Sequence, residues 1–146
     1  MKRSLLLFLL AFCPSLEAAE NFCDGKTPHP IDVWFDKAME KTEGVTVNIR
    51  NVQGEAYSRW DKELNRVYNE LMDRLNDNDK NRLREAQRAW VKFRDTEFEL
   101  LWADGLYGHI GGTLAPIVVS DVGRGIVRAR VCTLMKYLEM VKASGN

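Results

Sequence analysis

Apolar residues between Glu55 and Glu99 recur every three or four positions in two separate runs, which places each run on one face of an α-helix. The first run comprises Ala56, Trp60, Leu64, Val67, Leu71 and Leu75. The second comprises Leu83, Ala86, Trp90, Phe93 and either Glu97 or Phe98. Polar residues 76–79 lie between the runs and supply a turn and a helix cap. Neither helix can bury its stripe alone in water. The pattern therefore predicts a long antiparallel helical hairpin, about 47–75 and 77–104, packed together or against the rest of the chain.

Two further helices are predicted on either side of the hairpin. A short N-terminal helix over about 30–41 follows from the helical spacing of Ile31, Phe35, Ala38 and Met39. A C-terminal helix over about 120–141 would bury Ile126, Val127, Val131, Leu134, Leu138 and Val141. The expected fold class is all-α, a small helical bundle built on the hairpin.

The first residues have the pattern of a secretory signal peptide. A basic start, residues 1–3, precedes an apolar run over 5–12 that is too short to span a bilayer as a helix. Small residues then predict cleavage after Ala19. We therefore expect a signal peptide at 1–19 and a single domain at 20–146.

A lipid anchor at Cys13 is the less favoured interpretation of the same segment. Residues 10–13 resemble a lipoprotein signal, but that signal requires a small residue where Phe12 stands. No later stretch is long and apolar enough for a transmembrane helix. These features predict a periplasmic or secreted protein.

The cysteine content predicts one disulfide bond. Removal of the signal peptide would leave Cys23 and Cys132 as the only cysteines. Two cysteines in an oxidising compartment favour pairing, and such a bridge would hold the N-terminal segment on the last helix. The alternative is two free thiols without a role. A redox-active pair is disfavoured because neither cysteine lies in a Cys-x-x-Cys motif.

The charge balance excludes some classes of partner. The sequence has 21 basic and 21 acidic residues, and signal-peptide cleavage would leave one more acidic than basic residue. A nucleic-acid binder would carry a clear basic excess, so no nucleic-acid partner is expected. A nearly neutral chain also has no global field to steer a strongly charged partner.

Candidate catalytic and metal-binding residues are sparse. His29 and His109 have no companions at metal-ligand spacing, so no metal is expected. The acidic residues between Asp95 and Asp104 are spaced so that alternate members lie on different helix faces, which indicates a solvated surface. No activated nucleophile or phosphate-binding loop is present in the sequence. We expect neither an enzyme nor a bound cofactor.

The predicted hairpin register suggests a polar network. If the turn lies between Asp77 and Asn78, the two helices face each other at positions that sum to about 155. The expected structural network comprises Asp61, Asn65, Gln87 and Arg94. In it an Asp61–Arg94 pair would set the register, because partly buried charge pairs specify geometry more than they add stability. The alternative is an exposed recognition patch.

A glycine-rich loop follows the hairpin and is the best candidate for a partner-binding surface. The candidate residues are Tyr107, His109, Ile110, Gly111, Gly112 and Thr113. Loops held by rigid helices often carry the binding residues of a protein. Equally, the glycines could serve only to turn the chain tightly between two helices, with apolar loop side chains capping the core. The sequence leaves both interpretations open.

Two elements, in this order and at this distance, resemble the LprI-like lysozyme-inhibitor family. The first is Ala56-Tyr57-x-x-Trp60-Asp61-x-Glu63-Leu64-Asn65-x-x-Tyr68. The second is Leu83-x-x-Ala86-Gln87-x-x-Trp90-x-x-Phe93-Arg94-Asp95, followed later by Gly111-Gly112-Thr113. The resemblance extends over about 46–138 and implies a small, secreted or membrane-anchored helical protein.

The resemblance also implies a function. Some family members are described as inhibitors of lysozyme, so a protein partner, a lysozyme, is expected. This chain departs from the common pattern, because Phe98 stands where many members have a cysteine, and Val52 lies near the position of another. The usual internal bridges would then be absent. The alternative function is a non-inhibitory helical binding or scaffolding module of the cell envelope.

Overall fold

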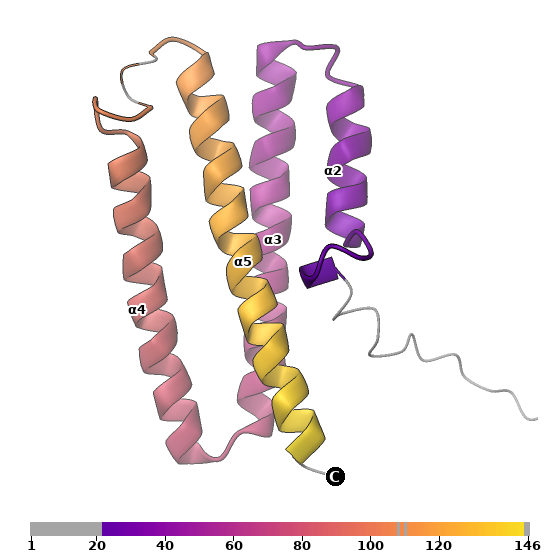
Figure 1. Ribbon diagram of the computed structural model, residues 1–146, viewed down its shortest axis with the longest axis vertical. Helices are drawn as coiled ribbons and strands as arrows, with labels where there is room; N and C mark the ends of the chain where they lie inside the picture. Colours follow the sequence, from indigo (N-terminus) through magenta and orange to yellow (C-terminus); the bar gives the residue numbers. More distant parts are fainter. Residues whose placement is uncertain (1–21, 108, 110, 145–146) are drawn as a thin grey trace, which may run out of the picture.

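The computed structural model describes residues 22–107, 109 and 111–144, and this part of the chain is helical without a strand. Its helices are α2 (Pro30–Glu40), α3 (Thr46–Arg74), α4 (Asp77–Leu101) and α5 (Leu114–Ser144) (Figure 1). The prediction of an all-α fold with a long helical hairpin is confirmed. The predicted signal peptide and Cys13 lie outside the described residues.

The boundaries of two helices differ from the prediction. Helix α5 begins at Leu114, six residues before the predicted start, and α4 ends at Leu101. Pro116 is the third residue of α5. Proline is tolerated there because the first N–H groups of a helix have no partner within the helix. Pro116 therefore lies in the first turn of α5.

The turn between α3 and α4 has the predicted cap. The Asn76 side chain accepts a hydrogen bond from the Asp79 backbone N–H at 3.0 Å. Asp77 and Asp79 lie in the first turn of α4, where negative charge interacts favourably with the helix dipole. The polar cluster therefore ends one helix and starts the next.

Helices α3 and α5 form the hydrophobic core. They pack against each other along their length, with α5 lying in front of α3 in Figure 1. The buried core side chains of the two helices are Trp60, Leu64, Val67, Leu71, Val127, Val131, Leu134, Met135 and Leu138. Most of these residues belong to the apolar stripes that the sequence predicted for the first arm of the hairpin and for the C-terminal helix.

Helix α4 is less deeply packed than its periodic pattern predicted. Figure 1 shows it at the edge of the bundle, and only Leu83 and Leu101 of this helix are buried. Ala86 and Phe93, which belong to the predicted stripe, are exposed. The reason is that the apolar face of α5 is covered by α3, so α4 contacts the flank of α5.

One close contact fixes α4 on α5. The Phe98 ring lies directly against the backbone of Gly123, which is buried in α5, and a Cβ atom at position 123 would overlap that ring. Gly123 therefore provides the space that lets the two helices approach each other at this level.

The N-terminal segment is bonded to the last helix. Cys23 and Cys132 form a disulfide with a Cα–Cα distance of 5.5 Å, which confirms the predicted pairing. Asp32 of α2 makes an ion pair with Arg128 of α5 at 2.9 Å. Phe22 is buried in the same core. The disulfide and the ion pair hold the segment before α3 on α5.

Candidate functional site

The loop between α4 and α5 is folded back on the end of α4. The backbone N–H of Leu106 donates to the Ala103 carbonyl at 2.9 Å, and that of Tyr107 donates to the Leu101 carbonyl at 3.3 Å. Gly111 and Gly112 have φ angles of +62° and +57°, a left-handed conformation that glycine adopts without strain. The glycines therefore provide the reversal of direction that precedes α5.

The predicted loop residues are mostly exposed. Tyr107 is half-buried, whereas His109 and residues 111–113 are exposed. Ile110 lies outside the described residues. The loop backbone thus turns the chain and also presents side chains to solvent, so features of both interpretations of the sequence occur together.

Three large apolar side chains of this region were missed by the sequence analysis. Trp102, Leu106 and Leu114 are 49%, 40% and 53% exposed. We call these three residues the loop patch. They were missed because they fall outside the helical stripes. The signal that could have found them is the presence of large apolar residues beside a glycine-rich loop. Exposed aromatic and aliphatic side chains of this kind are typical of protein-binding surfaces.

The predicted polar network keeps one expected contact, the hydrogen bond that Asn65 donates to the Asp61 carboxylate at 3.3 Å, and its other members have different partners. Asn65 donates to the Asp61 carbonyl at 2.9 Å within α3. Arg94 forms an ion pair with the neighbouring Asp95 at 2.7 Å. Gln87 accepts a hydrogen bond from Arg130 of α5 at 3.1 Å. Gln87 thus links α4 to α5, which packs beside both arms of the hairpin.

Asn65 and Gln87 do come together, but as walls of a groove between α3 and α4. The groove has a volume of about 490 Å³ and is lined by Asn65, Tyr68, Arg84, Gln87, Arg88 and Val91. Its lining includes no carboxylate. Arg130 holds Gln87 from the side of α5, and burial lowers the pKa of Arg130. The groove therefore combines two arginines and two amide side chains with the apolar surface of Tyr68 and Val91.

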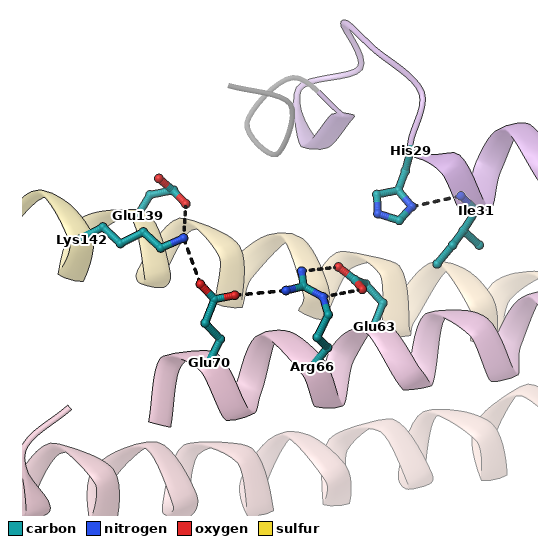
Figure 2. Close-up of polar contacts among 7 residues, drawn as sticks. All are labelled: His29, Ile31, Glu63, Arg66, Glu70, Glu139 and Lys142. Carbon is teal, nitrogen blue, oxygen red and sulfur yellow. Dashed lines mark hydrogen bonds and ion pairs between the residues drawn. The ribbon is translucent and has the colours of Figure 1, made fainter. Parts of the chain in front are cut away.

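A chain of charged side chains joins the C-terminal part of α3 to the C-terminal part of α5. It lies at the end of the bundle opposite the loop between α4 and α5 (Figure 1). Figure 2 shows Arg66 between Glu63 and Glu70, with Lys142 of α5 between Glu70 and Glu139. Burial alone would raise the pKa of Glu70, but the hydrogen bonds and charges of Lys142 and Arg66 outweigh it and hold the pKa below its usual value. This network stabilises the helix pair and lies apart from the loop patch.

His29 is the N-cap residue of α2. Its Nδ1 atom accepts a hydrogen bond from the Ile31 backbone N–H at 3.1 Å (Figure 2). The imidazole ring lies between Phe22 and Trp60, with centroid distances of 4.6 and 4.7 Å. Burial lowers the pKa of His29, against the opposing effect of the nearby Glu63 and Asp32. His29 is therefore a structural residue that favours its neutral form.

The structure predicts that acidification from pH 7.5 to 5.5 lowers the free energy of unfolding through His29. The unfolded chain takes up a proton near the ordinary pKa of histidine, whereas the folded chain binds it only at lower pH. Urea unfolding at several pH values would measure the slope. His29→Asn keeps a capping oxygen but cannot titrate, so it should flatten the profile. Equal slopes for wild type and His29→Asn would contradict the assignment.

Neither a metal site nor a membrane-spanning helix occurs in the described part of the chain. Across residues 22–107, 109 and 111–144, no group of three or more potential ligands is arranged to hold a metal ion. Within that part of the chain, no helix has the length and apolar character needed to cross a membrane.

The fold and the loop define a small, disulfide-bonded helical protein that displays apolar side chains at one end of its bundle. A family model described as "Lysozyme inhibitor LprI" matches residues 37–134. The chain belongs to this family, and the match includes α3, α4, the loop between α4 and α5, and most of α5. No curated protein and no solved structure gives a significant match.

Proposed function

We propose that this protein is a periplasmic or secreted inhibitor that binds a lysozyme-type muramidase through the loop between α4 and α5. The observation that carries the proposal is membership of a family of lysozyme inhibitors, with a match that covers this loop. The Cys23–Cys132 disulfide supports the compartment, because such bonds persist in oxidising environments. The signal-peptide pattern at 1–19 supports it as well.

The chemistry of the loop suits the cleft of such an enzyme. Muramidases of the lysozyme type use a pair of carboxyl groups that flank the bond they cleave. Tyr107 and His109 can donate hydrogen bonds to carboxylates, while the loop patch offers apolar area for burial at the rim. A nearly neutral protein needs this local complementarity, because its net charge provides little steering.

The proposal is tested with the oxidised protein, residues 20–146, and lysozymes of several classes. We expect dose-dependent inhibition of at least one lysozyme at micromolar concentrations or below, together with direct binding in calorimetry. Absence of both inhibition and binding for every class would contradict the proposal. Purification of another envelope protein with the chain would then favour the alternative of a non-inhibitory scaffolding module.

The contact surface is tested with substitutions in the loop. The triple variant Trp102→Ala, Tyr107→Ala, His109→Ala should weaken lysozyme binding by roughly 30-fold or more, because exposed aromatic anchors commonly contribute on the order of 2 kcal/mol. The melting temperature should fall only slightly, since Trp102 and His109 are exposed and Tyr107 is half-buried. Calorimetric titration measures the affinity.

Met140→Ala is the matched control for the loop variant. Met140 is an exposed apolar residue near the C-terminal end of α5, far along the helix from the loop. This variant should bind like the wild type. If the loop variant also binds like the wild type, the contact surface lies elsewhere, while lysozyme inhibition itself would still stand.

A further inference from the structure

Helix α4 has a row of small and apolar residues on a face that the bundle leaves exposed. The row comprises Ala86, Ala89, Phe93, Thr96 and Leu100, and all five are exposed. Phe93 and Leu100 are each 51% exposed. The spacing alternates between three and four residues, which is the a and d pattern of a helix that packs against another helix. We call this row the α4 seam.

The seam is separate from the face that contacts α5. Gln87 and Phe98 face α5, where they contact Arg130 and Gly123. At 100° per residue, the seam lies about 150° around α4 from that face. The described part of the chain therefore provides α4 with a neighbour on one face and leaves the apolar seam without one.

We propose that the α4 seam binds the same seam of a second copy of this chain, antiparallel, to form a two-fold symmetric dimer. The distribution of residue sizes supports this partner. Ala86, Ala89 and Thr96 of the seam have small side chains, whereas Phe93 and Leu100 have large ones. An antiparallel pairing places Leu100 opposite the second copy's Ala89 and Phe93 opposite its Thr96, so each large residue of the seam meets a small one. A parallel pairing would place equal residues opposite each other.

The charges beside the seam support the same orientation. Lys92 and Glu99 are exposed along one edge of the seam, in the positions that flank the a residues. Neither takes part in the ion pairs that α4 forms within the described residues. In the antiparallel register, Lys92 lies near the second copy's Glu99, and the two-fold axis repeats the pair.

The dimer is independent of lysozyme binding, since the seam and the loop patch have no residue in common. It is tested by analytical ultracentrifugation of residues 20–146 from about 1 to 200 µM, with circular dichroism to verify the fold. We expect a reversible monomer–dimer equilibrium. Lys92→Glu should weaken the dimer about tenfold, because it replaces two attractive contacts by two repulsive ones. Phe93→Glu should abolish the dimer.

The charge swap makes the test specific. Glu99→Lys alone should weaken the dimer like Lys92→Glu, and the combined Lys92→Glu, Glu99→Lys variant should restore it. Lys136→Glu changes an exposed lysine on α5 and should leave the equilibrium unchanged. A wild-type monomer at all concentrations would overturn the proposal. So would a dimer that persists in Phe93→Glu, or one that Lys92→Glu and Lys136→Glu affect equally.

Discussion

Replacing Cys23 and Cys132 together with alanine is expected to lower the free energy of unfolding by about 4 kcal/mol. The two cysteines are separated by 109 positions, so the disulfide closes most of the domain into one loop. Breaking it increases the conformational entropy of the unfolded chain, and the gain grows with the length of the loop. The loss is large against a total stability of about 5–15 kcal/mol for a typical domain. Guanidinium unfolding followed by circular dichroism measures it.

Reduction of the wild type is the control for this variant. The reduced wild type and the double alanine variant should unfold at similar denaturant concentrations, because neither has the cross-link. Phe22, next to Cys23 in the chain, packs against His29 and Trp60. Its burial should therefore be lost more easily in the reduced wild type and in the double alanine variant. If the double variant is within about 1 kcal/mol of the oxidised wild type, the entropic account of the disulfide is wrong.

Trp60→Ala is expected to lower the free energy of unfolding by about 3–5 kcal/mol, whereas Trp90→Ala should lower it by about 1–2 kcal/mol. Trp60 has no exposed surface, and its removal leaves a cavity between α3, α5 and the N-terminal segment. Trp90 is half-buried, and the guanidinium groups of Arg94 and Arg130 lie over its ring. Both tryptophans lie on predicted apolar stripes, so the expected difference in the loss of stability comes from their different burial in the structure.

Trp60→Phe keeps the measurement informative if Trp60→Ala fails to fold. The Nε1 atom of Trp60 is buried and has no hydrogen-bond partner among the described residues. Phenylalanine removes that N–H group and retains most of the ring, so the loss should be clearly smaller than for alanine. Equal losses for Trp60→Ala and Trp90→Ala would contradict the assignment of the core to α3 and α5.

The candidate site could be predicted only in part. The loop was identified because glycines interrupt the periodic pattern between two helices, and that signal is local. The loop patch was not identified, because the exposure of Trp102 and Leu114 depends on how the ends of α4 and α5 are placed. The partners of Arg94 and Gln87 could not be predicted either, since equal height along a hairpin does not imply contact when both arms also pack on a third helix.

The sequence by itself determined the helices, the turn at 76–79 and the pairing of the cysteines. Helix formation follows from local spacing and caps, and Cys23 and Cys132, the two cysteines outside the predicted signal peptide, can form a single intramolecular bridge. The tertiary structure alone decided which stripes pair. Apolar stripes are nearly interchangeable as partners, because hydrophobic burial is not directional. Shape selects among them, through the close approach of Phe98 to Gly123 and the fit of α5 on α3. That choice leaves one face of α4 exposed.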